Sequence, residues 1–299
     1  MGTHRPALLI AISMLGAASS TVRAGDWPTY QHDNRRSGVT AEKLHLPLRS
    51  VWEYTCVEPP RTAWSGPAKW DAYANIRDLK SMRNFDPVFH ATAAHGRVFF
   101  GSSVDDAVHG LDLRTGEEKW AYVTGGPVRL PPSFHEGRLY FGSDDGWVYC
   151  LRADGGQLLW RYEAAPEAGR IPSDGKLISL SPCRTGVLVQ DGRAYFAASL
   201  LPWDKSCLCA LDARTGSLEG AGLYRREHEQ MTAQGPMIAS PTRLYVSQGR
   251  QAPLVFDCTG ANPCNAELSI PVVGSTYVVA RATMQDGGFL VAAPVWASP

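Results

Sequence analysis

Apolar and polar residues alternate along several short stretches of this chain, with the two-residue period that a β-strand produces. The clearest run is LYFGS (139–143), WVYCL (147–151) and QLLWRYEA (157–164), separated by the segments DDG and RADGG. Asp and Gly accept the positive backbone angles that tight hairpins require. An apolar segment precedes this run, so the pattern predicts a unit of four short antiparallel strands.

The same unit recurs along the chain. A turn, an arginine and an apolar strand are combined in HGRVFFGSS (95–103), EGRLYFGSD (136–144), DGRAYFAAS (191–199) and PTRLYVSQG (241–249). The arginines, at positions 97, 138, 193 and 243, are about 40 to 55 residues apart. This period is typical of a β-propeller, whose blades bury their faces by stacking on one another. We therefore predict an all-β fold, a propeller of four-stranded antiparallel blades.

A second phrase closes each unit, as in LDLRTGEEKW (111–120) and CLRADGGQLLW (150–160). We expect Gly116 to take the left-handed conformation in its turn, and Gly155 to be the structural glycine of the next unit. Trp120 and Trp160 are predicted to be mostly buried at equivalent places, each against a neighbouring blade. The repeat therefore indicates a fold before it indicates any activity.

These phrases resemble the tryptophan-docking repeat of pyrroloquinoline quinone (PQQ)-type β-propellers over about residues 90–260. That family includes quinoprotein alcohol dehydrogenases and a non-enzymatic outer-membrane assembly lipoprotein. The stretch DWPTYQHDNRRSGVT (26–40) is similar to the start of secreted bacterial PQQ-like repeat proteins. The resemblance implies the propeller fold, and it does not by itself imply an activity.

The number of blades predicts that the propeller is incomplete. Units begin near positions 88, 129, 184 and 234, and a fifth starts within 278–294. The family that the repeat resembles closes with seven or eight blades. We expect four to five blades here, in residues 88–299, and further blades beyond residue 299. Residues 25–87 form an N-terminal segment, with an insertion and with a lone outer strand at 48–56 that would complete the last blade.

The N-terminus has the pattern of a secretory signal peptide. His4 and Arg5 precede an apolar run from Ala7 to Ala18, and Val22-Arg23-Ala24 has the small residues of a cleavage site. We expect cleavage after Ala24 and export to the periplasm or the extracellular space, with an uncleaved membrane anchor as the alternative. Elsewhere no apolar run approaches the length of a membrane helix. The charge is balanced, 29 basic against 29 acidic residues, which argues against a nucleic-acid partner.

The seven cysteines of an exported chain allow disulfides, but they cannot all pair within it. Cys258 and Cys264 in DCTGANPC are the best local pair. Cys207 and Cys209 lie two apart on a predicted strand, so they point to one face and pair awkwardly. We interpret them as buried thiols, with a Cys-x-Cys metal site as the alternative.

The resemblance implies that PQQ enzymes stack the quinone between a tryptophan and a disulfide of adjacent cysteines, beside a calcium ion. This chain has no two adjacent cysteines. Its acid pairs, Asp105-Asp106 and Asp144-Asp145, lack the alternating acids of a calcium loop and suit hairpin turns. Signatures of hydrolase, phosphate-binding and zinc-protease sites are also missing. No cofactor is therefore predicted, and PQQ with calcium belongs to the alternative below.

Two arginines are not explained by the strands and turns of the repeat. Arg129 lies nine residues before Arg138, and Arg184 lies nine before Arg193, where the innermost strands enter the central channel. They predict either an anionic ligand or paired contacts with the hairpin acids. We place any binding site in the funnel on this side, where the candidate residues are Arg129, Arg184, Asp105, Asp106, Asp144, Asp145, Trp203, Asp204 and Lys205.

The sequence favours a secreted, non-catalytic propeller that acts as a scaffold and presents one loop face to a protein or a small ligand. A fragment of a PQQ-dependent quinoprotein dehydrogenase is the first alternative. The second is an accessory propeller fused to an enzyme beyond residue 299. Loops that carry function are usually the elaborated ones, and the long connection 161–183 is such a loop.

Overall fold

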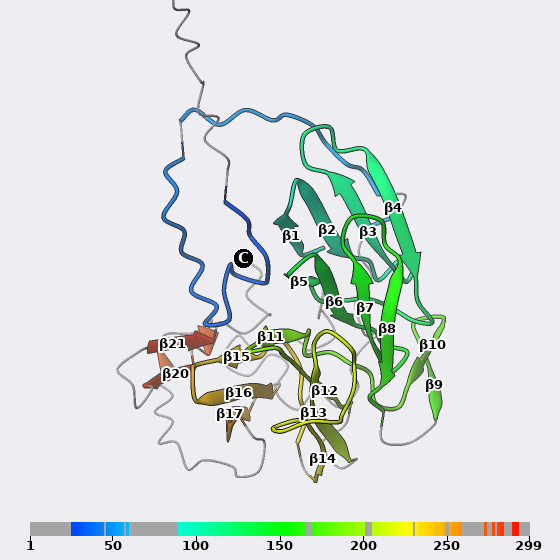
Figure 1. Ribbon diagram of the computed structural model, residues 1–299, viewed down its shortest axis with the longest axis vertical. Coiled ribbons are helices and arrows are strands. Elements are labelled where there is room, and N and C mark those ends of the chain that lie inside the picture. The colour runs from blue at the N-terminus through cyan, green and yellow to red at the C-terminus, as the bar shows by residue number, and fades with distance from the viewer. Residues whose placement is uncertain are drawn as a thin grey trace, which may run out of the picture.

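The computed structural model describes residues 25–44, 46–56, 58–59, 89–165, 169–200, 205–229, 231–248 and 251–258, and the backbone of short strands between 272 and 292. In this part of the chain the regular elements are β-strands. Antiparallel sheets follow one another along an arc, and in the sheets of three or four strands the first strand in the chain lies on the inner side (Figure 1). This is the arrangement of propeller blades. Across the described residues there is no helix long and apolar enough to cross a membrane.

The first two blades match the predicted units strand by strand. Blade 1 contains β1 (Ala91–Ala94), β2 (Arg97–Gly101), β3 (Ala107–Asp112) and β4 (Glu118–Val123), hydrogen-bonded in that order. Blade 2 contains β5 (Ser133–His135), β6 (Arg138–Gly142), β7 (Trp147–Arg152) and β8 (Leu158–Glu163), also in order. The three stretches from which the unit was predicted correspond to β6, β7 and β8.

The later units are less regular. Blade 3 contains β11 (Leu188–Gln190), β12 (Arg193–Ala198), β13 (Ser206–Asp212) and β14 (Tyr224–His228). Blade 4 contains β15 (Ile238–Ala239), β16 (Arg243–Gln248) and β17 (Gln251–Asp257). A separate hairpin of β9 (Arg170–Ser173) and β10 (Lys176–Ser179) lies between blades 2 and 3 in the chain. Further on, β18 (Val272–Val273) pairs with β19 (Tyr277–Val278), and β20 (Ala280–Thr283) pairs with β21 (Phe289–Ala292).

The hydrophobic core lies between adjacent blades. Phe141 and Tyr149 of blade 2 belong to a buried cluster with Phe99 of blade 1. Tyr140 of blade 2 belongs to a second cluster, with Phe196 of blade 3. Neighbouring residues of one strand thus enter different cores, because side chains alternate between the two faces of a sheet. Each blade is stabilised by burial against the blade on either side of it.

A tryptophan from one blade packs against a turn of the next. Trp120 Nε1 donates a hydrogen bond to Ala153 O (3.1 Å), and Trp160 Nε1 donates to Ala213 O (3.1 Å). The rings lie against glycines of those turns: a Cβ added to Gly156 would be 2.6 Å from the Trp120 ring. Trp160 is 9% exposed, whereas Trp120 is only partly buried.

The structural glycine of the second turn is Gly156 rather than Gly155. Gly116 has the expected left-handed φ of 72°, and Gly156 has 69°, while the φ of Gly155 is not positive. Gly156 N donates to Arg152 O at 2.9 Å, just as Gly116 N donates to Asp112 O at 2.9 Å. The turn hydrogen bond therefore selects the second of two adjacent glycines, one residue later than the sequence indicated.

The predicted outer strand at 48–56 is present as a contact and not as a strand. These residues have no regular secondary structure. Trp52 Nε1 nevertheless donates to Leu113 O (2.9 Å), and the Trp52 ring lies against Gly116, as Trp120 lies against the next blade. Tyr54 donates to Glu118 (2.9 Å). The segment thus covers the outer side of blade 1.

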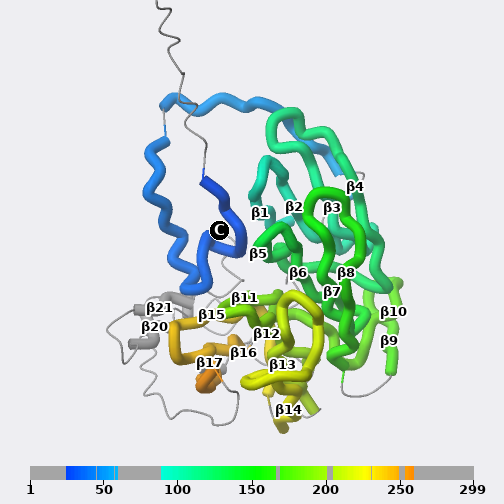
Figure 2. Tube along the Cα trace, viewed as in Figure 1, coloured from blue at the N-terminus to red at the C-terminus, as the bar shows by residue number. Residues whose placement is uncertain are grey.

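Residues 26–36, near the start of the described chain, run along the inner side of the arc (Figure 2). Hydrogen bonds of 2.6 to 2.9 Å join them to blades 1 to 4 in turn: Trp27 to Ala93, Pro28 to Phe134, Asn34 to Val189 and Ala239, and Arg36 to Met237. The backbone N–H of His95, in the β1–β2 turn, donates to the Asp26 carboxylate (3.1 Å). The segment therefore lies at the end of the channel where the β1–β2 turn is. One peptide segment therefore ties together strands that are more than 100 residues apart in sequence.

Candidate functional site

The hairpins β2–β3 and β6–β7 lie on one face of the propeller, which we call the hairpin face. The connection after β4 runs beside both: Thr124 N donates to Asp106 O (2.7 Å), and Gly125 N donates to the Asp145 carboxylate (2.9 Å). Arg129 follows on this connection. The structure thus places Asp145 and Arg129 on the same face, in the geometry that the blade pattern predicts.

The two candidate arginines converge on one carboxylate. Arg184 forms a two-point ion pair with Asp144, from Nε to Oδ1 (2.8 Å) and from Nη2 to Oδ2 (2.7 Å). Arg129 Nε donates to the same Oδ2 (2.7 Å). Asp144 and Arg184 are each 1% exposed, and Arg129 is 7% exposed. An aspartate from blade 2 therefore links the starts of blades 2 and 3.

The charge balance of this cluster favours a structural role. Burial alone would raise the pKa of Asp144, but the guanidinium groups of Arg184 and Arg129 outweigh burial and hold that pKa below its usual range. The carboxylate is ionised and offsets part of the positive charge of the two arginines. Of the two interpretations from sequence, an anionic ligand or paired Arg–Asp contacts, the geometry supports the paired contacts.

The other hairpin acids are also used within the fold. Asp145 accepts hydrogen bonds from the backbone N–H of Trp147 (2.9 Å) and from the Tyr149 hydroxyl (2.6 Å). Asp105 contacts His109 Nε2 at 3.0 Å. In the described ranges no group of three His, Cys, Asp or Glu is arranged to hold a metal ion. These acids order the hairpins, as the turn chemistry of the sequence predicts.

Lys176 fastens the β9–β10 hairpin to the hairpin face. Its ammonium group contacts the Asp106 carboxylate and donates to two backbone carbonyls of the blade 1 hairpin, at 2.7 and 3.1 Å. Burial raises the pKa of Asp106, and the Lys176 charge partly opposes that rise. The backbone of β10 adds a second attachment, because Ser179 N donates to Asp144 O at 2.7 Å. The hairpin is held at two points, on blade 1 and on blade 2.

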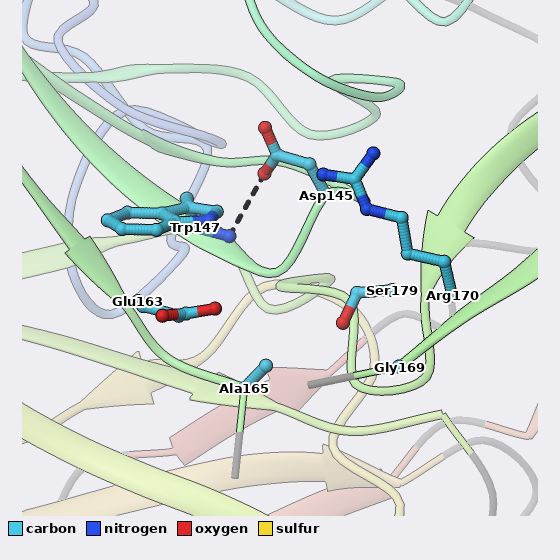
Figure 3. A pocket seen from close by; sticks show the side chains of 7 residues that line it. All are labelled: Asp145, Trp147, Glu163, Ala165, Gly169, Arg170 and Ser179. Carbon is cyan, nitrogen blue, oxygen red and sulfur yellow. Dashed lines mark hydrogen bonds between the residues drawn. The ribbon is translucent and has the colours of Figure 1, made fainter. Parts of the chain in front are cut away.

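A cavity of about 400 Å³ opens between the end of blade 2 and the base of this hairpin (Figure 3). Its lining consists of Asp145, Trp147, Glu163, Ala165, Gly169, Arg170 and Ser179. Trp147 and Glu163 face each other across β7 and β8, and Arg170 and Ser179 face each other across β9 and β10. The close approach of the two walls depends on Gly146, whose φ is 89° and whose added Cβ would be 2.8 Å from Ser179 Oγ.

Side chains of opposite charge line this cavity. Glu163 and Arg170 are both exposed and lie on different walls, and no ion pair within 4.0 Å joins them. The Arg161 guanidinium covers the Trp147 ring at 4.6 Å from its centroid. Ser179 is buried, and its hydroxyl oxygen accepts from Ser181 N at 3.1 Å. The cavity therefore combines an aromatic wall with two acids, a base and a hydroxyl.

Comparison with known proteins identifies the fold family. Residues 104–252 match the family model described as outer membrane protein assembly factor BamB. The chain is similar to the quinohemoprotein alcohol dehydrogenase of Comamonas testosteroni, with 15% identity over 90% of this chain and 45% of that one and a TM-score of 0.58. It also matches BamB of Moraxella catarrhalis (17% identity, 68% of this chain and 63% of that one, TM-score 0.46). The search of curated proteins returned no match.

The chain is a PQQ-like β-propeller repeat protein. The predicted fold class is confirmed by these likenesses together with the four-stranded sheets. The chain spans less than two thirds of the length of the two solved structures just named. At 15% identity the likeness to the quinohemoprotein alcohol dehydrogenase shows the fold alone and does not extend to an activity.

Some predicted residues of the PQQ-like propeller do not enter the site. Lys205 pairs with Glu227 at 3.4 Å on the surface of blade 3. Trp203 and Asp204 lie outside the described residues, as does Cys264, the expected partner of Cys258. Cys207 and Cys209 are buried, with their sulfur atoms 3.7 Å apart. This agrees with their interpretation as core thiols.

The cavity residues Glu163, Arg170 and Ser179 were not predicted from sequence. The sequence feature that points to them is the long connection between blades 2 and 3, within which no single residue was predicted. β9 and β10 form a local hairpin with Gly175 at its turn, where φ is 74°. A second hairpin recognised within that insertion would have located the cavity wall, though not the charged side chains that line the cavity.

Proposed function

We propose that this PQQ-like propeller is a non-catalytic scaffold that binds a protein or a small ligand on its hairpin face. The observation that carries the proposal is the β9–β10 hairpin, which leaves the blade pattern, is fastened to blade 1 by Lys176, and walls a cavity. An added element that is rigidly attached suits a binding surface, because less ordering entropy is lost on binding.

The two ends of the channel support this choice of face. Residues 26–36 lie across the inner strands at the opposite end, where the turns between strands are short. On the hairpin face, Val123 at the end of β4 is 70% exposed and Leu177 on β10 is 57% exposed, whereas Leu113 and Leu158 at the opposite end are 39% and 41% exposed. Exposed apolar groups beside charged ones are common at protein-binding sites.

Dehydrogenase activity is the competing function, because the family fold is shared with quinoprotein dehydrogenases. The residues present do not fit the quinone in the way that the resemblance implies. The sequence has no two adjacent cysteines, and the channel-side Arg129 and Arg184 are bonded to Asp144. Adding PQQ and calcium to the purified protein should give neither a bound-quinone absorbance nor dye reduction with primary alcohols, and dye reduction would overturn the non-catalytic assignment.

We further propose that the protein is exported and that its mature chain begins at Gly25. The support is the apolar run and the small residues that precede this position. Mass spectrometry of the exported protein should find Gly25 at its N-terminus. Retention of residues 1–24 would contradict a cleaved signal peptide.

The binding face is tested by photo-crosslinking in the native host. A photoreactive amino acid is placed at Leu177 on the hairpin face or at Leu113, a partly exposed residue of a turn at the other end of blade 1. We expect defined crosslinked adducts from position 177 and none from position 113. Adducts from position 113 alone would place the working surface on the opposite face.

A further inference from the structure

The cavity beside Trp147 has no assigned ligand, and its chemistry restricts what would bind there. We infer that it is a site for a small zwitterion of the amino-acid or dipeptide class, whose ammonium group pairs with Glu163 and whose carboxylate pairs with Arg170. This inference rests on the proposed function, because it names the ligand class of the same face. A volume of about 400 Å³ suits a ligand of this size.

The charges of the lining favour a ligand that carries both signs of charge. An anion would bring its charge against the Asp145 and Glu163 carboxylates, and a cation alone would offer nothing to the Arg170 guanidinium. An uncharged apolar ligand would remove water from both groups without replacing their hydrogen bonds. A ligand that carries both charges satisfies the two walls at once, and Arg170 offers a carboxylate two parallel hydrogen bonds.

Asp145 lines the cavity but is already used by the protein. It accepts hydrogen bonds from Gly125 N, Trp147 N and the Tyr149 hydroxyl. Glu163 is therefore the carboxylate that we assign to the ammonium group. The Trp147 ring supplies an apolar wall for the ligand side chain, and Arg161 lies over that ring.

Both charged residues stand on ordered strands. Glu163 ends β8, which is paired with β7 opposite Trp147. Arg170 begins β9 and is paired with Ser179, whose backbone is bonded to Asp144. Lys176 then fixes the other end of the hairpin to blade 1. A site with both walls fixed before binding discriminates by geometry as well as by charge.

Calorimetric titration with four related probes tests the assignment: leucine, glycyl-leucine, leucinamide and N-acetyl-leucine. Leucinamide keeps only the ammonium group, and N-acetyl-leucine keeps only the carboxylate. We expect leucine or glycyl-leucine to bind at least about tenfold more tightly than either single-charge probe, the size of one charged hydrogen bond. No binding of either zwitterion, or equal binding of all four probes, would overturn the inference.

Substitutions then assign each charge. E163Q should weaken leucine and leucinamide about tenfold without weakening N-acetyl-leucine, and R170Q should weaken leucine and N-acetyl-leucine about tenfold without weakening leucinamide. The matched controls E117Q and R114Q lie on an exposed turn of blade 1 and should change nothing. Zwitterion binding that survives both cavity variants, or that falls equally in the controls, would contradict the site.

The outcome separates the two proposals. Crosslinking from Leu177 without zwitterion binding would reject the ligand class and keep the hairpin face as the working surface. If neither crosslinking from Leu177 nor zwitterion binding is found, the proposed function is rejected as well. Circular dichroism of each variant shows whether the fold is retained, and a variant that does not fold is replaced by E163D or R170K, which displace the charge and should still weaken their probe.

Discussion

Arg184 and Asp144 form a two-point ion pair, at 2.8 and 2.7 Å, in which both side chains are almost fully buried. The pair joins residues 40 positions apart and links blade 2 to the start of blade 3. Arg129 shares the same carboxylate. A single aspartate therefore offsets part of the positive charge at the hairpin end of two blades, and its removal should affect the whole molecule.

We expect Asp144→Asn to lower the free energy of unfolding by about 3–5 kcal/mol, because it removes the buried carboxylate charge that two guanidinium groups share. Urea denaturation at neutral pH measures this loss. Asp105→Asn is the control, since Asp105 is a half-exposed hairpin acid. A cost for Asp144→Asn no larger than that of the control would contradict a structural ion pair.

The same pair predicts a pH dependence. The pKa of Asp144 is lower in the folded protein than its usual 3.8, so the pair stabilises the fold above about pH 4 and this contribution is lost as the pH falls through the folded pKa. We expect the unfolding free energy of the Asp144→Asn variant to fall less steeply between pH 4 and pH 2 than that of the wild type. Parallel slopes in urea titrations across that range would be the opposing result.

The two adjacent glycines of blade 2 should respond differently to alanine. Gly156→Ala forces a side chain into a left-handed conformation and against the Trp120 ring, so we expect a loss of about 1–3 kcal/mol. Gly155→Ala meets the movable end of the Gln157 side chain and should cost less than about 0.5 kcal/mol. Thermal unfolding of the two variants compares them directly. Equal losses would mean that the turn is formed differently.

The two tryptophans should also differ. Trp160→Ala should cost about 3–5 kcal/mol, the usual range for removing a buried aromatic ring. Trp120→Ala should cost less, because the ring of Trp120 is only partly buried. Equilibrium denaturation followed by circular dichroism avoids the loss of fluorescence signal. A larger cost for Trp120→Ala than for Trp160→Ala would reverse the order that burial predicts.

Lys176→Met should release the β9–β10 hairpin while leaving the blades folded. Hydrogen exchange by mass spectrometry should become faster in peptides from 170–179 and remain unchanged in β6 and β7. Lys205→Met is the matched control, because Lys205 makes a surface ion pair on blade 3. Unchanged exchange in the hairpin would show that its backbone bond to Asp144 is sufficient to hold it.

Local chemistry explains what the sequence by itself determined. Alternating apolar positions and the Asp-Gly turns predicted β6, β7 and β8, and their recurrence predicted stacked blades. Each of these signals involves residues within one hairpin, whose backbone geometry is set by neighbours in sequence. Local signals could not distinguish Gly155 from Gly156, because either glycine tolerates a positive φ. The turn hydrogen bond selects one of them.

Only the tertiary structure decided which groups meet. The sequence placed Arg129 and Arg184 at the channel entrance, but their convergence on Asp144 follows from the stacking of blades 2 and 3. Residues 26–36 bond to four blades because strands distant in the chain are packed side by side, and Glu163 and Arg170 line one cavity because β9 leaves the blade pattern soon after β8 ends. Contacts of this kind depend on the angle and distance between blades, which are set by the packing of the apolar core and not by any single stretch of sequence.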